Sequence, residues 1–143
     1  MKNILIGNGE LYLSMAPFRD DLKKYGPFDI IWNLAQELNE YYDDLYKYNF
    51  SKLYLFGNIK DYDIPKNLKL FSSQLDKICE SLKNGKKVLI HCMGGRGRTG
   101  MVYACLLKKL NKVSSEDAIA LALKVCKGPE TEEQKEFIKN LVT

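Results

Sequence analysis

One stretch decides how this chain folds: Val88-Leu89-Ile90-His91-Cys92-Met93-Gly94-Gly95-Arg96-Gly97-Arg98-Thr99-Gly100. Its apolar, β-branched start predicts a buried strand over 87–90, and the apolar pattern that begins at Gly100 predicts a helix. A glycine-rich turn between a strand and a helix directs backbone N–H groups, and the positive end of the helix dipole, into one concavity. The sequence therefore predicts an oxyanion-binding loop.

This loop carries a thiol at its start and a guanidinium at its end. Five residues separate Cys92 from Arg98. A cysteine that faces several N–H dipoles and an arginine is expected to have a pKa of roughly 3.5–7.5, which makes it a thiolate nucleophile at neutral pH. The planar fork of Arg98 can pair with two oxygens of a phosphate group. The alternative interpretation of Cys92, a small buried apolar side chain, explains none of these neighbours.

Length and composition fit one globular domain over residues 1–143. The chain is 45% hydrophobic and 28% charged, and no apolar run approaches the ~18 residues of a membrane span. Polar residues interrupt the first positions, so we expect no secretory leader and a cytoplasmic protein. The net charge of +4 favours phosphorylated ligands, but no basic tract predicts nucleic-acid binding. The cysteine spacings and the single histidine match no metal site, so we expect neither a metal nor a cofactor.

Strand patterns alternate with helix patterns along the chain. We expect strands at 11–14, 29–34, 52–56 and 87–90, and a helix and loop over 37–48. Further helices are expected from near Pro17, from near Pro65, and over 101–110, 114–126 and 131–141. The alternation predicts an α/β fold with a central, mostly parallel sheet flanked by helices on both faces. The order of its strands is not readable from the sequence.

The loop resembles the signature of the cysteine-dependent phosphatases: His91-Cys92, five residues, then Arg98-Thr99-Gly100. Segments 11–20, 91–95 and 130–134 are similar to the compact archaeal-type tyrosine phosphatases. The resemblance implies the dual-specificity phosphatase fold and removal of phosphate from phosphotyrosine in proteins through a cysteinyl-phosphate, with phosphoserine and phosphothreonine open as further substrates. Phosphorylated proteins would be the partners, and phosphate, vanadate or sulfate would bind in the loop. Two alternatives stay open: action on phosphoinositides or RNA 5′-phosphates, and a non-catalytic phosphate-binding module.

In this interpretation Cys92 attacks phosphorus, and the transferring group is held by Arg98 and the loop amides of Met93, Gly94, Gly95, Arg96 and Gly97. Thr99 is expected to donate its hydroxyl to the Cys92 sulfur, although helix N-capping would also explain a threonine there. The resemblance assigns His91 a supporting role, orienting the loop and tuning the cysteine.

The general acid is expected in the segment between the strand near residue 55 and the helix near Pro65. The resemblance selects Asp61, because the family's acid lies four residues before a proline. Asp63 is the alternative acid, but it would also suit the N-cap of a helix that starts beside Pro65.

Two further residues have competing interpretations. Gln134 could position the hydrolytic water, but Thr131 and Gln134 also have the spacing of a capping box. Arg96 replaces a commonly apolar position of the archaeal-type loop, which suggests either polyanionic substrates or a solvated side chain.

Overall fold

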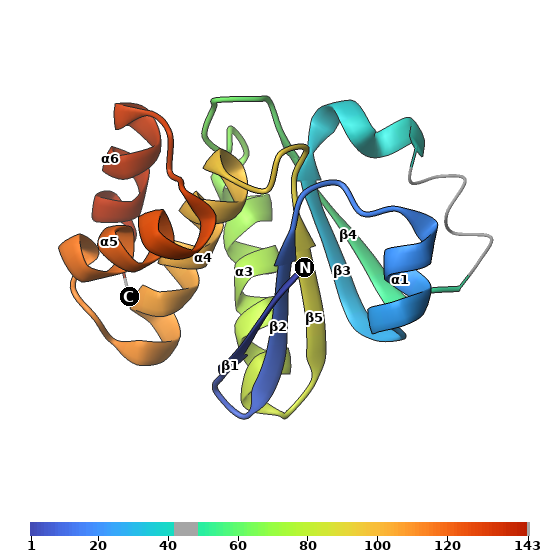
Figure 1. The fold of residues 1–143 in the computed structure, drawn as a ribbon. Helices are drawn as coiled ribbons and strands as arrows, with labels where there is room; N and C mark the ends of the chain where they lie inside the picture. The colour runs from blue at the N-terminus through green and yellow to red at the C-terminus, as the bar shows by residue number, and fades with distance from the viewer. Residues whose placement is uncertain (42–48, 143) are drawn as a thin grey trace.

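The computed structural model describes residues 1–41 and 49–142. Its centre is a five-stranded sheet in the order β1-β2-β5-β3-β4 (Figure 1). Strand β1 pairs antiparallel with β2, whereas the β2–β5, β5–β3 and β3–β4 pairs are parallel. The predicted, mostly parallel sheet is therefore confirmed. The strands are β1 (Lys2–Ile6), β2 (Gly9–Ser14), β3 (Phe28–Ala35), β4 (Ser51–Ile59) and β5 (Lys87–His91).

Helices cover both faces of this sheet, as predicted. One side carries α1 (Arg19–Tyr25), and the other side carries α3 (Leu68–Lys83), α4 (Gly97–Asn111), α5 (Ser115–Cys126) and α6 (Glu132–Asn140) (Figure 1). A short 3-10 helix, η1 (Gln36–Leu38), follows β3 directly. The rest of the helix and loop expected over 37–48 lies mostly outside the described residues.

Strand β1 was not expected from the sequence. It forms a hairpin with β2, in which Ile6 pairs with Gly9 across the two-residue turn Gly7-Asn8. Gly7 has a φ of 61°, a conformation that suits glycine at the first position of a tight hairpin turn. The Gly-Asn pair was therefore the overlooked sequence signal for β1.

The helix starts follow from local capping. The helix expected from near Pro65 begins instead at Leu68, because the Asn67 side chain accepts a hydrogen bond from the Leu70 N–H at 3.0 Å. Helix α5 begins after Ser114, whose hydroxyl accepts from the Asp117 N–H at 3.1 Å. Ser114 is therefore the N-cap of α5.

The core lies around β5 and α4. Val88, Leu89 and Ile90 are fully buried, as expected for a strand covered on both faces. Helix α4 is apolar around most of its circumference and is buried along nearly its whole length. Together they hold both ends of the glycine-rich loop in a rigid setting.

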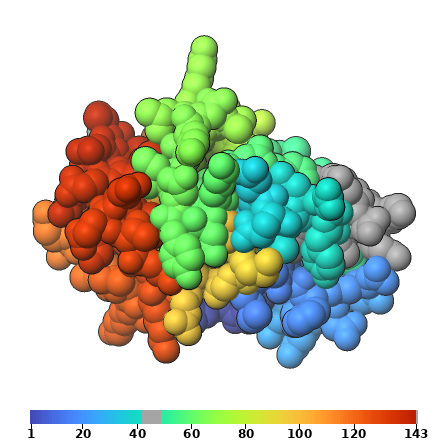
Figure 2. All heavy atoms as spheres, turned by 90° about the horizontal axis from the view of Figure 1, so that it is seen from above, coloured from blue at the N-terminus to red at the C-terminus, as the bar shows by residue number. Residues whose placement is uncertain are grey.

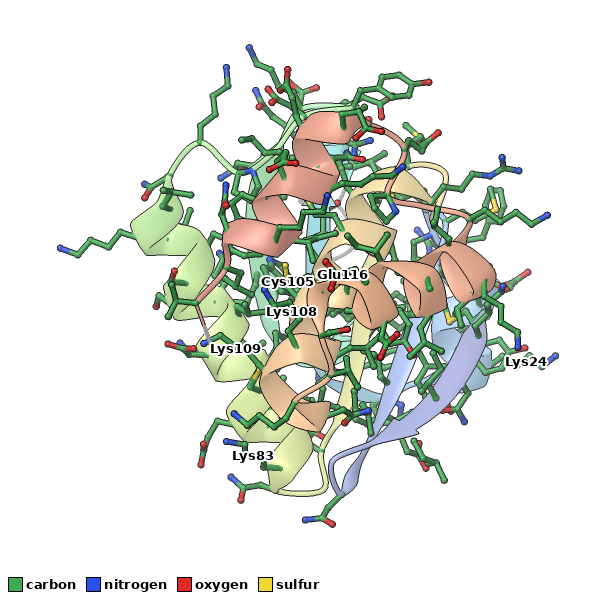
Figure 3. All side chains as sticks on the ribbon, turned by 90° about the vertical axis from the view of Figure 1, so that its left-hand side faces the viewer. Lys24, Lys83, Cys105, Lys108, Lys109 and Glu116 are labelled. Carbon is green, nitrogen blue, oxygen red and sulfur yellow. The ribbon has the colours of Figure 1, made fainter. Side chains whose placement is uncertain are left out.

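Helix α6 is fastened to α4 by a buried lysine. Lys108 of α4 is 7% exposed and donates to the carbonyl oxygens of Ile138 at 2.7 Å and Leu141 at 2.8 Å (Figure 3). These are carbonyls at the C-terminal end of α6, where a cation also complements the helix dipole. Within the described residues, no helix combines the length and the apolar composition needed to cross a membrane.

Candidate active site

The loop between β5 and α4 lies at the carboxyl edge of the parallel strands. Carboxyl ends of parallel strands meet at one edge, where α/β proteins commonly bind ligands. Here β2, β3, β4 and β5 deliver the segments that follow Ser14, Ala35, Ile59 and His91. In a view directed at this edge of the sheet, the loop (gold) lies between the green segment that follows β4 and the blue segment that follows β2 (Figure 2).

The Cys92 sulfur lies inside this loop and accepts two hydrogen bonds. The Gly95 N–H donates to Sγ at 3.2 Å, and the Thr99 hydroxyl donates to it at 3.0 Å. Cys92 itself is only 2% exposed. Donors aimed at sulfur stabilise its ionised form, which is the form that acts as a nucleophile.

Gly95 is required by the way the loop packs on the end of β2. Its φ is 74°, and a Cβ there would lie 2.7 Å from the Met15 backbone nitrogen. On the same side, the Ala16 N–H donates to the Met93 carbonyl at 2.9 Å. This close approach of two backbones turns the Gly95 N–H toward Cys92.

Arg98 is buried beneath the loop and held from several directions. It is 2% exposed, and its Nη1 and Nη2 each lie 2.7 Å from one carboxylate oxygen of Glu37. Nη1 also donates to the Ile59 carbonyl at 2.8 Å, and Nη2 lies 3.4 Å from Asp61 Oδ1. Burial alone would lower the pKa of Arg98, but the Glu37 hydrogen bonds and the charges of Cys92, Glu37 and Asp61 raise it. The side chain is therefore a fixed cation.

Glu37 is a site residue that the sequence analysis did not identify. The hydrogen bonds from Arg98 lower the pKa of Glu37 and outweigh the opposing effect of burial. Glu37 lies in η1, directly after a strand that neighbours β5 in the sheet. A carboxylate immediately following an apolar parallel strand was the available signal, but using it required the strand order.

The structure separates the two candidate acids. The Asp61 side chain is 55% exposed and reaches the Arg98 guanidinium. Asp63 instead accepts the Ile64 N–H at 2.8 Å and lies 3.8 Å from Lys66. The interpretation of Asp63 as the helix N-cap is wrong, because Asn67 caps α3. Of the two carboxylates, Asp61 lies beside the arginine of the loop.

Thr99 does not cap a helix. Helix α4 already begins at Gly97, so Thr99 lies in its first turn and points its hydroxyl at Cys92. The N-cap interpretation of Thr99 is therefore wrong.

His91 supports the loop from the end of β5. The residue is fully buried, and its Nδ1 lies 3.2 Å from the Cys92 carbonyl oxygen. Because a carbonyl only accepts, Nδ1 carries the proton of the neutral ring. Burial lowers the pKa of His91 to about 4, with a further lowering by Arg98 and a partial offset by the Cys92 hydrogen bond. His91 is thus neutral at pH 7.

Gln134 is buried and forms the expected capping box with Thr131. Its Oε1 accepts from the Glu130 N–H at 2.8 Å, and its Nε2 donates to the Asp63 carbonyl at 3.2 Å. The amide thus joins the start of α6 to the segment that carries Asp61. Because an amide nitrogen carries two protons, this contact leaves Nε2 a second N–H, and the positioning of water by Gln134 stays a prediction.

The remaining loop residues differ in their exposure to solvent. Met93 and Gly94 are exposed, Gly97 is buried at the start of α4, and Arg96 extends an exposed side chain from the outer side of the loop. All four cysteines are buried thiols.

Comparisons with known proteins agree with this geometry. The family model described as "Dual specificity phosphatase, catalytic domain" matches residues 11–143. A putative tyrosine phosphatase, 197R of Invertebrate iridescent virus 6, is 33% identical over 91 residues, which cover 62% of this chain and 34% of the viral protein. The chain therefore matches about a third of that relative's length.

Solved structures share the fold. Tk-PTP in its active form superposes with a TM-score of 0.78 at 26% identity, covering 97% of this chain and 96% of Tk-PTP. PTPMT1 in complex with PI(5)P has a TM-score of 0.76 at 16% identity, covering 96% of this chain and 92% of PTPMT1, which shows likeness of fold alone. Because the family model spans nearly the whole chain, this protein belongs to the dual specificity phosphatase catalytic-domain family.

Proposed function

We propose that this protein removes phosphate from phosphotyrosine in proteins through a cysteinyl-phosphate intermediate. One observation carries the proposal: the Cys92 sulfur receives N–H and O–H donors inside a loop whose arginine is buried, oriented and adjacent to Asp61. The tyrosine preference is supported by the likeness to the viral tyrosine phosphatase and to Tk-PTP.

In the first step the Cys92 thiolate attacks phosphorus, and the bond from phosphorus to the leaving oxygen breaks. Arg98 and the loop amides hold the non-bridging oxygens, where charge develops in the transition state. Protonated Asp61 gives its proton to the departing tyrosyl oxygen. The 3.4 Å contact between Asp61 and the Arg98 guanidinium supports this role, because Arg98 is expected to bind the phosphate.

In the second step water attacks the cysteinyl-phosphate, and Asp61, now ionised, accepts a proton from that water. The sulfur–phosphorus bond breaks, and the sulfur leaves as a thiolate. The Thr99 hydroxyl, 3.0 Å from Sγ, stabilises the charge that returns to sulfur. Inorganic phosphate is released, and the starting thiolate is restored.

The test is phosphate release from a phosphotyrosine peptide by the wild type and by Cys92→Ser. We expect Cys92→Ser to abolish turnover while still binding the peptide, because the loop amides and Arg98 remain. Cys79→Ser is the matched control, since Cys79 is also a buried thiol but lies on α3. Retained turnover in Cys92→Ser would reject the nucleophile, and wild-type binding without phosphate release would indicate a binding module.

A further inference from the structure

A cavity of about 390 Å³ lies against the outer side of the catalytic loop. The loop forms one wall of this cavity, and the other walls come from β1, the end of β2 and the turn after α5. We call this space the flanking cavity. It is lined by Met1, Lys2, Leu13, Ser14, Met15, Gly94, Gly95, Arg96, Val125, Cys126 and Lys127.

Three side-chain cations from three separate segments converge on the flanking cavity. They are Lys2 of β1, Arg96 of the loop and Lys127 after α5, and no described residue that lines the cavity is an aspartate or a glutamate. All three are exposed to solvent, and lysine and arginine are charged at pH 7. Such a concentration of one sign of charge in a concave site attracts anions.

A backbone contact holds the Lys2 ammonium, and the backbone segments that carry Arg96 and Lys127 pack on each other. The Lys2 ammonium donates to the Val125 carbonyl, which ties β1 to the end of α5. A Cβ at Gly128 would collide with the Arg96 carbonyl, and one at Gly100 would collide with the Gly128 carbonyl. The turn that carries Lys127 is therefore packed directly on the catalytic loop.

The flanking cavity shares Gly95 with the catalytic site. The Gly95 N–H points to the Cys92 sulfur, whereas Gly95 and Gly94 also line the flanking cavity. Two anions could thus lie on either side of one short loop. Glu130 packs its carboxylate against Gly97 and is not among the residues that line the cavity.

We propose that the flanking cavity binds a second phosphate group, so that the enzyme also accepts small molecules carrying two or more phosphates. One phosphate is hydrolysed at Cys92 while another is held by Arg96, Lys127 and Lys2. The inference rests on the proposed phosphatase activity and extends it to this substrate class. A separate inorganic phosphate has the same chemistry and could occupy the same cavity.

The first arm of the test compares substrates on one scaffold. Phosphate release is measured from myo-inositol 1-phosphate, 1,4-bisphosphate and 1,4,5-trisphosphate, which vary the number and spacing of phosphates. We expect kcat/KM to be about tenfold higher for the best multiply phosphorylated compound, since a charge-assisted contact contributes at least that factor. The preference should shrink as salt is raised.

Lys127→Gln should abolish this preference, so that the ratio of the kcat/KM values falls to about one. The substitution removes one cation and nearly keeps the length of the side chain. Lys112→Gln is the matched control. Lys112 is also an exposed lysine in the left-handed conformation after a helix, with a φ of 57° against 59° for Lys127, but it does not line the flanking cavity. It should leave the preference unchanged.

The second arm needs no turnover. Calorimetry with inorganic phosphate is performed on Cys92→Ser and on Cys92→Ser combined with Lys127→Gln. Two binding events in the first protein and one in the second would establish the flanking site. If they occur without a substrate preference, the cavity binds a separate phosphate rather than a second group of the substrate.

A single binding event in Cys92→Ser, together with equal kcat/KM for all three inositol phosphates, would overturn the inference. That outcome is distinct from failure of the proposed function, in which neither the phosphotyrosine peptide nor any inositol phosphate is hydrolysed. The binding arm would still decide the flanking site in that case.

Discussion

Glu37 and Arg98 form a two-point ion pair, with each carboxylate oxygen 2.7 Å from one terminal nitrogen of the guanidinium. The two residues are 61 positions apart in the chain. Glu37 takes one proton from each of Nη1 and Nη2, and the Ile59 carbonyl at 2.8 Å takes the second proton of Nη1. The Nε and Nη2 edge is therefore the edge that we expect to face phosphate.

Replacing Glu37 with Gln should loosen Arg98 without changing its charge. A glutamine amide has one accepting oxygen and one donating nitrogen, so it cannot accept a hydrogen bond at each terminal atom as the carboxylate does, and the guanidinium loses its fixed orientation. We expect kcat/KM for a phosphotyrosine peptide to fall about 10- to 100-fold, the cost of a small misplacement at a reacting group. Inhibition by inorganic phosphate should weaken in parallel.

Glu40→Gln is the control, since Glu40 is an exposed glutamate three residues further along the chain. If Glu37→Gln were as active as Glu40→Gln, or faster than the wild type, Glu37 would not be positioning Arg98 for substrate.

Asp61→Asn should slow the first chemical step far more than Asp63→Asn. A positioned general acid contributes roughly 100- to 10,000-fold, and Asp61 is the carboxylate beside Arg98. The defect should be larger for phenyl phosphate than for p-nitrophenyl phosphate, because the poorer leaving group needs the proton more. Single-turnover rates for both substrates give the ratio, and the opposite order of the two variants would move the acid to Asp63.

Thr99→Ala should make the cysteinyl-phosphate accumulate. The hydroxyl stabilises the sulfur that leaves in the second step, and its loss is expected to slow hydrolysis of the intermediate about tenfold. Rapid quench followed by mass spectrometry would detect phosphate on Cys92. Thr99→Ser keeps the donor and should behave like the wild type, whereas equal accumulation in both variants would argue for a packing role.

Folding stability should fall as the pH drops from 7 to 5, because His91 is protonated more readily in the unfolded chain. Its pKa is lowered from 6.5 to about 4 by burial, so between these values the unfolded state binds the extra proton. The free energy of unfolding should decrease by about 2 kcal/mol between pH 7 and pH 5.

Urea unfolding at each pH measures this slope, and His91→Gln should remove most of it. Glu37 and Asp29 also have lowered pKa values, but their contribution to stability is lost only below the usual range of carboxyl groups. A slope that persists unchanged in His91→Gln would assign the acid sensitivity to other groups.

The sequence was most informative where the chemistry is local. Cys92, Gly95, Arg98 and Thr99 lie within one short stretch, so their spacing alone predicted a loop in which the structure brings them together. The parallel sheet followed from the alternation of strand and helix patterns.

The features that were missed depend on contacts between distant segments. Glu37 meets Arg98 only because β3 and β5 are parallel neighbours, and the strand order is a property of the folded sheet. The position of α3 depended on Asn67, a short polar residue whose capping role competed with that of Asp63.

The attachment of α6 has a consequence for how the acid can move. Lys108 donates hydrogen bonds to carbonyls at the C-terminal end of α6. Near the N-terminal end of α6, Gln134 donates a hydrogen bond to the Asp63 carbonyl. The chain beyond Asp61 is thereby clamped, so any swing of the carboxylate toward a substrate is borne by the few residues before Asp63. Helix α6 thus fixes one end of the short segment within which Asp61 can move.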